Sequence, residues 1–107
     1  MSTPPITTGE VVVVTGASSG VGRAVARAYG RRGARVGLVA RDETALQAAA
    51  DEIVASGGEA LTCPGDVADP DTTELAATAV EERWGRIDVW VNCAMATVFA
   101  PIADMEP

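Results

Sequence analysis

A chain of 107 residues with 48% hydrophobic and 21% charged residues is long enough for one folded domain and lies outside the compositions of disordered and fibrous proteins. Fifteen acids outnumber the basic residues, which are all arginine, and the formal net charge of -7 argues against nucleic acid or an anionic membrane as a partner. The chain has no histidine or lysine and one tyrosine, which excludes mechanisms that need His, Lys or a second Tyr.

Nothing in the sequence indicates secretion or a membrane span. Residues 1–9 form a short leader without the basic and long apolar stretches of a secretory signal. The longest apolar run, residues 11–14, is far shorter than the roughly 18 residues that a membrane span needs. We therefore expect a cytoplasmic protein, and its two cysteines are expected to be reduced.

The first predicted elements are a strand and an amphipathic helix. Residues 11–14 are four valines without polar alternation, which is typical of a strand buried on both faces of a parallel sheet. A helix is predicted from Val21 to Gly33, with Arg23, Arg27 and Arg31 on its polar side. Its apolar side is predicted to comprise Val21, Ala24, Val25, Ala28 and Tyr29.

The middle of the chain repeats the alternation of strand and helix. A second strand is predicted at residues 35–40, and a third at residues 59–63. Between them a helix contains the apolar positions Leu46, Ala49, Ile53 and Val54 and is closed by two glycines, Gly57 and Gly58.

The last predicted elements are a third helix and a fourth strand. Asp69 has the position of an N-cap and Pro70 that of the first helical residue, and the helix extends to about Trp84, before Gly85. Residues 87–91 form the fourth strand, followed by a loop.

This alternation predicts an α/β protein with a parallel sheet and right-handed crossovers. A doubly wound sheet of this kind has the strand order 3-2-1-4, which separates its third and fourth strands by roughly 14 Å at about 4.8 Å per strand. Cys63 and Cys93 lie near the ends of those two strands, so we expect free thiols and buried small side chains rather than a disulfide.

Residues 15–22, T-G-A-S-S-G-V-G, connect the first strand to the first helix. Gly16, Gly20 and Gly22 allow a sharp turn and a close approach to a ligand, and free N–H groups at a helix start attract phosphate. The alternative is a glycine-rich turn without a ligand. The position between an all-valine strand and a helix favours nucleotide binding.

With this loop the sequence resembles the short-chain dehydrogenase/reductase family, NAD(P)-dependent oxidoreductases with a Rossmann fold. The resemblance also rests on Asp66-Val67 and on N-C-A-M at residues 92–95, where the family usually has N-N-A-G. It implies that Asp66 contacts adenine, although a turn or cap role is the alternative, that Asn92 ties the central strands together, and that the Ala94 backbone lines the cofactor ribose. Cys93 and Met95 depart from the family pattern, and Met95 adds a side chain where the backbone passes close to the cofactor.

The end of the second strand bears on the choice of cofactor. An acid there binds the ribose 2′-OH of NAD, whereas an arginine accepts the 2′-phosphate of NADP. The chain has Ala40 and Arg41 at this point, which favours NADP over NAD, although Arg41 could instead be a solvated residue near Asp42 and Glu43. The candidate cofactor-binding residues are Gly16, Ser18, Ser19, Gly20, Val21, Gly22, Arg41, Asp66, Val67, Asn92 and Ala94.

The family's catalytic Ser, Tyr and Lys have no match here, so no catalytic residue and no metal site is predicted. Residues 10–107 are interpreted as the N-terminal part of a Rossmann domain, truncated after strand four, from an oxidoreductase acting on an alcohol or carbonyl compound. Such a full-length protein is expected to bind a small-molecule substrate and to form an oligomer. The alternative is a stand-alone, non-catalytic nucleotide-binding or interaction module.

Overall fold

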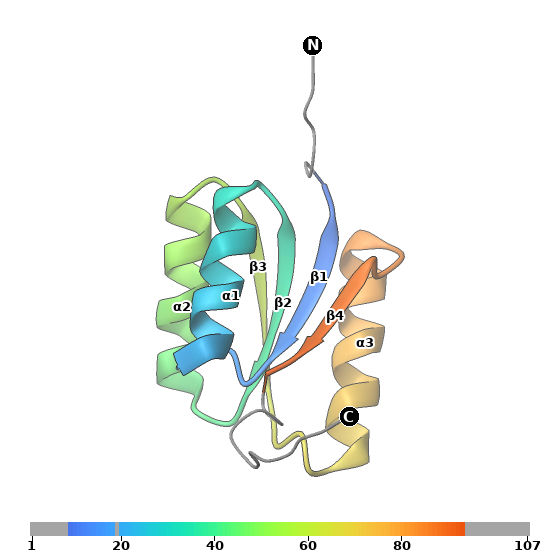
Figure 1. Ribbon diagram of the computed structural model, residues 1–107. Helices are drawn as coiled ribbons and strands as arrows, with labels where there is room; N and C mark the ends of the chain where they lie inside the picture. The colour runs from blue at the N-terminus through green and yellow to red at the C-terminus, as the bar shows by residue number, and fades with distance from the viewer. Residues whose placement is uncertain (1–8, 19, 94–107) are drawn as a thin grey trace, which may run out of the picture.

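The computed structural model describes residues 9–18 and 20–93 and has three layers, with a parallel sheet between helices (Figure 1). The strands are β1 (Val11–Thr15), β2 (Arg35–Ala40), β3 (Glu59–Pro64) and β4 (Val89–Asn92). They lie in the order β3-β2-β1-β4, and every pair is parallel. The predicted α/β class and strand order are confirmed.

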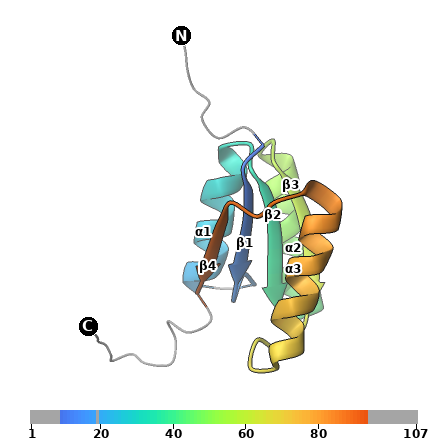
Figure 2. The same cartoon turned by 90° about the vertical axis from the view of Figure 1, so that its right-hand side faces the viewer.

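Helices cover both faces of the sheet (Figure 2). The helices α1 (Gly20–Arg31) and α2 (Glu43–Ala55) lie on one face, and α3 (Pro70–Trp84) lies on the other. Asp69 is the N-cap of α3, where its side chain accepts the N–H of Asp71, and Gly85 is the C-cap, as predicted. In the described part of the chain, no helix has the length and apolar character required to traverse a bilayer.

Strand β1 is buried along its whole length, as the valine run predicts. Its side chains alternate between two apolar cores. Val12 and Val14 pack with Leu38 and Ile53 under α1 and α2. On the opposite face, the core under α3 comprises Val11, Val13, Val39, Ala76 and Val80.

Strand β4 begins two residues later than predicted, at Val89. Asp88 accounts for the difference, because its carboxylate accepts the N–H of Val11 at 2.9 Å while its own N–H donates to the Val11 carbonyl at 2.8 Å. The side chain thus takes a backbone donor at the start of β1. Asp88 therefore joins β4 to β1 through two hydrogen bonds just before the regular strand pairing begins.

The predicted apolar face of α1 is wrong in part. Val21 is 65% exposed and Ala24 is also exposed, whereas the fully buried positions of the helix are Gly22, Ala26 and Gly30. The physical reason is close helix packing: a Cβ on Gly30 would lie 3.0 Å from Ile53 Cγ1 of α2. Small residues therefore face the neighbouring helix, and side-chain hydrophobicity does not reveal them.

Arg23 is also not on an open polar face. Its Nη2 lies 2.7 Å from Glu52 Oε2 and its Nε lies 3.1 Å from Glu52 Oε1. The guanidinium of α1 thus donates two hydrogen bonds to the carboxylate of α2. Hydrogen bonding to Arg23 lowers the pKa of Glu52, against the opposing effect of desolvation. This pair joins the two helices on one side of the sheet.

Candidate nucleotide-binding site

The glycine-rich loop turns directly from β1 into α1. Gly16 has φ +66°, a left-handed conformation that glycine adopts without steric cost. The N–H groups of Gly16 and Ala17 both donate to the Val39 carbonyl, at 2.8 and 3.2 Å. These bonds anchor the loop to the end of β2. The first N–H groups of an α-helix have no partner within the helix, and such groups attract phosphate in general.

Gly22 sets how closely α1 approaches this loop. A Cβ at Gly22 would overlap the carbonyl oxygen of Gly16 and lie 2.6 Å from the carbonyl carbon. Both are backbone atoms, so no side-chain rotation could relieve the overlap. The glycine spacing is therefore required by the turn itself.

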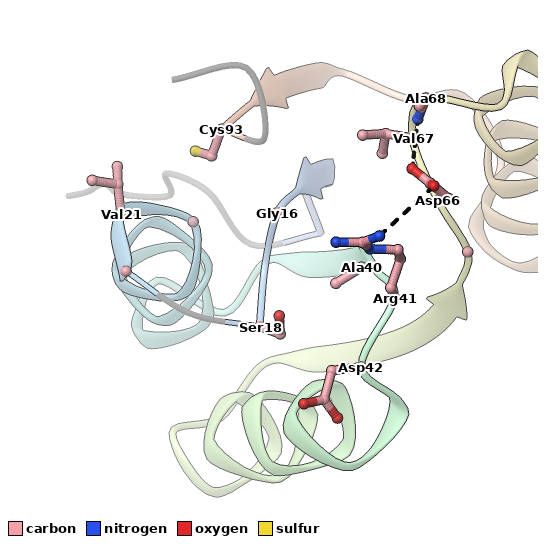
Figure 3. A pocket seen from close by; sticks show the side chains of 13 residues that line it. Gly16, Ser18, Val21, Ala40, Arg41, Asp42, Asp66, Val67, Ala68 and Cys93 are labelled. Atoms are coloured by element: carbon pink, nitrogen blue, oxygen red, sulfur yellow. Dashed lines mark hydrogen bonds and ion pairs between the residues drawn. The ribbon is translucent and has the colours of Figure 1, made fainter. Parts of the chain in front are cut away.

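A cavity of about 650 Å³ opens beyond the ends of β1, β2 and β3, beside the loop (Figure 3). Open α/β sheets bind ligands at this edge. The cavity contains most of the predicted cofactor-binding residues that the structure describes. Its lining comprises Gly16, Ser18, Gly20, Val21, Gly22, Ala40, Arg41, Asp42, Gly65, Asp66, Val67, Ala68 and Cys93.

One end of the cavity carries a cation and a carboxylate from different strands. Arg41 follows β2 and Asp66 follows β3, and Arg41 Nη1 lies 3.9 Å from Asp66 Oδ2. Asp66 Oδ1 accepts the N–H of Ala68 at 2.9 Å, which confirms the turn role, and the residue also lines the cavity. Asp42 is engaged elsewhere, as the N-cap of α2 that accepts the N–H of Ala45. The carboxylate that faces Arg41 is therefore Asp66.

The other end is formed by Val21 and Cys93, which Figure 3 shows apart from the Arg41–Asp66 pair. The exposure of Val21 is explained by this position at the cavity. Cys93 is 9% exposed, as expected for a buried side chain, whereas the prediction is wrong for Cys63, which is only partly buried at the edge strand β3. Both are free thiols, and burial raises the pKa of both. Sequence reasoning treated Cys93 as a buried small side chain and missed its place in the cavity wall.

Asn92 lies at the end of β4 and does not line the cavity. Its Oδ1 accepts the Thr15 hydroxyl of β1 at 3.2 Å and the indole N–H of Trp90 at 3.1 Å. These contacts link β4 to β1 and agree with the strand-linking role that the resemblance implies. Trp90 was missed, although its spacing of two residues from Asn92 places both side chains on one face of the strand.

Some predicted positions lie outside the described residues, namely Ser19, Ala94 and Met95. Among the described side chains, no group of three or more His, Cys, Asp or Glu residues is arranged to hold a metal ion. The cavity thus presents one arginine, acidic side chains and a glycine-rich backbone.

Comparison with known proteins assigns this arrangement to a family. The profile of the family described as "short chain dehydrogenase" matches residues 10–107. The chain belongs to the short-chain dehydrogenase family. It is 39% identical, over 92% of its length, to a short chain dehydrogenase from Pseudocercospora fijiensis, of which it covers 32%. It is 44% identical, over 90% of its length, to L-rhamnose 1-dehydrogenase (NAD(P)(+)) from Azotobacter vinelandii, of which it covers 39%.

Solved structures of short-chain dehydrogenases share the fold. A metagenomic short-chain oxidoreductase in complex with NADP aligns with TM-score 0.72 and 49% identity, covering 78% of this chain and 38% of its own. L-Sorbose reductase from Gluconobacter frateurii, complexed with NADPH and L-sorbose, aligns with TM-score 0.75 and 33% identity, covering 94% of this chain and 36% of its own. The chain therefore spans between 32% and 39% of the length of these short-chain dehydrogenases. The similarities favour the oxidoreductase hypothesis and lend no support to a stand-alone module.

Proposed function

We propose that this chain is the NADP-binding portion of a short-chain dehydrogenase. The observation that carries the proposal is the position of Arg41 at the cavity, after a β2 strand that ends in Ala40. Ala40 has no group that could hydrogen-bond a ribose hydroxyl, whereas a guanidinium can bind a phosphate with two bonds. The proposal is supported by the NADP and NADPH complexes of two similar structures.

The residues present fit such a cofactor. Gly16 and Gly22 have no side chains and pack closely together, so the loop backbone is open to a ligand. The amides at the start of α1 would hold the pyrophosphate. Arg41 would bind the 2′-phosphate, and Asp66 and Val67 would flank the adenine. When bound, the nicotinamide group supplies the hydride chemistry.

A carbonyl reduction also needs an acid that protonates the developing alkoxide. Tyr29 does not meet this need, because it packs against the core under α1 and α2, with Arg32 over its ring at 5.3 Å. It is not part of the cavity lining, and the chain has no lysine that could assist a tyrosine in proton transfer. We propose that residues outside this chain supply the acid in a cytoplasmic whole protein that acts on an alcohol or carbonyl compound, and that this chain alone is inactive.

Cofactor titration tests the proposal. The purified chain is titrated with NADPH and with NADH, followed by nicotinamide fluorescence and by calorimetry. NADPH is expected to bind at least about tenfold more tightly, because a hydrogen bond to a charged group contributes about 1.5–3 kcal/mol. Arg41→Ala should remove most of this difference, and Arg86→Ala, another exposed arginine, serves as the control. Equal affinities for NADPH and NADH in the unaltered chain would refute the NADP preference.

A further inference from the structure

The ion pair between Arg41 and Asp66 spans one end of the cavity (Figure 3). The Arg41 side chain is 79% exposed, so its guanidinium can exchange partners without breaking a packed core. Asp66 is held more firmly, because its Oδ1 accepts the Ala68 N–H and the Gly65 N–H donates to the Ala40 carbonyl at 2.9 Å. The turn therefore fixes Asp66, with Oδ2 directed at Arg41.

This geometry places a resident carboxylate beside the cation that would bind a 2′-phosphate. A guanidinium has five N–H donors in one plane, so a phosphate that binds two of them can draw Arg41 away from Asp66 Oδ2, which lies 3.9 Å from Nη1 as an ion-pair partner. A phosphate arriving at Arg41 would compete with Asp66 Oδ2 for those donors. The Asp66 carboxylate, a few ångströms away, would also repel the negatively charged phosphate in this solvent-open cavity.

We propose that Asp66 is a specificity-determining residue that competes with the nucleotide 2′-phosphate for Arg41, and so weakens the preference of this chain for NADP over NAD. The inference rests on the proposed function. The ratio of the two affinities depends on the two bound states alone, since the free protein is common to both. With NAD bound, Arg41 keeps Asp66 as its partner; with NADP bound, Arg41 turns to the phosphate and the carboxylate repels it. Both effects lower the ratio.

Asp66→Asn tests this competition cleanly. The amide oxygen of asparagine can still accept the Ala68 N–H, so the turn is retained while the charge is removed. Exposed ion pairs contribute little, and the ratio of NADP to NAD affinity is expected to rise about two- to fivefold. Absolute affinity for both dinucleotides falls if adenine also contacts Asp66. A higher ratio of NADP to NAD affinity supports the inference whether or not the two absolute affinities fall.

The measurement is calorimetric titration of the 107-residue chain with NADP⁺ and NAD⁺. Asp69→Asn is the matched control, because Asp69 also accepts one backbone N–H, as the N-cap of α3, but does not line the cavity. Asp66→Ser, whose hydroxyl can accept the Ala68 N–H, must shift the ratio in the same direction. In an Arg41→Ala background the effect of Asp66→Asn should shrink by at least about half, since the competition is gone and only repulsion remains.

The outcomes separate the two proposals. An unchanged or lower ratio of NADP to NAD affinity in Asp66→Asn, or an equal rise in Asp69→Asn, overturns the competition. The proposed function would still be supported in that case by an NADP preference that depends on Arg41. If the unaltered chain binds neither dinucleotide, the proposed function fails and the competition fails with it.

Discussion

Replacement of Gly22 by alanine tests whether the approach of α1 to the loop is as tight as the structure shows. The new Cβ would overlap the Gly16 carbonyl oxygen and lie 3.2 Å from the backbone N of Ala17. That loop segment cannot yield freely, because the Gly16 and Ala17 N–H groups are bonded to the Val39 carbonyl. The first turn of α1 must therefore move, and these two bonds must break with it.

The cost follows from these contacts. Overpacking costs about 1–3 kcal/mol, and each lost backbone hydrogen bond costs about 1 kcal/mol. The higher helix propensity of alanine returns at most about 1 kcal/mol. We expect Gly22→Ala to lower the free energy of unfolding by about 2–4 kcal/mol and to abolish dinucleotide binding.

Urea unfolding followed by far-UV circular dichroism measures the change. Gly30→Ala is the control on the same helix, where the Cβ would lie 3.0, 3.1 and 3.2 Å from Cγ1, Cγ2 and Cα of Ile53, a tight contact without the overlap found at Gly22. Its free energy of unfolding should fall by less than about 2 kcal/mol, because overpacking costs about 1–3 kcal/mol and the helix propensity of alanine returns up to about 1 kcal/mol. A Gly22→Ala variant as stable as Gly30→Ala, with dinucleotide binding intact, would refute the reasoning.

Three further results are expected. Ile53→Ala should cost about 2–5 kcal/mol in urea unfolding, because Ile53 is fully buried between α1 and α2; a loss below about 1 kcal/mol would contradict this packing. The pKa of Glu52 is lowered in the folded chain, so its stabilising contribution is complete above the usual value of 4.5 and is lost as pH falls through the lower folded value. The free energy of unfolding should therefore fall less steeply from pH 7 to pH 3 in Glu52→Gln than in the unaltered chain. Equal slopes in the two proteins would contradict the Arg23 contact. Because burial raises the pKa of Cys63 and Cys93, iodoacetamide should modify them more slowly at pH 7.5 than in the urea-unfolded chain, where equal rates would show open thiols.

Local signals made most of the fold predictable from sequence. The valine run of β1 and the cap at Asp69 are encoded by neighbouring residues, and the structure places both as expected. The Rossmann-type strand order follows from the alternation of elements. The late start of β4 could not be predicted, because it depends on Asp88 meeting Val11, which lies 77 residues away in the chain.

The candidate site divides in the same way. The glycine loop and Asp66 are recognised by spacing and resemblance, and the structure brings them to one cavity with Arg41. That Arg41 faces Asp66 rather than its sequence neighbour Asp42 depends on β2 and β3 lying side by side. Periodicity also placed Val21 in the core, because it registers hydrophobic side chains and does not register that α1 packs through its glycines.

The two hydrogen bonds between Asp88 and Val11 have a consequence for the order of folding. Loop closure entropy rises slowly with length, so joining β4 to β1 costs about 1 kcal/mol more than joining β1 to β2 across the shorter span from Val11 to Arg35. We expect β1, β2 and β3 to associate first and β4 to dock late, so that substitutions at Val89 accelerate unfolding and hardly slow folding. Because Cys93, at the end of β4, completes the cavity wall, a bound ligand would act chiefly by slowing the undocking of this last strand.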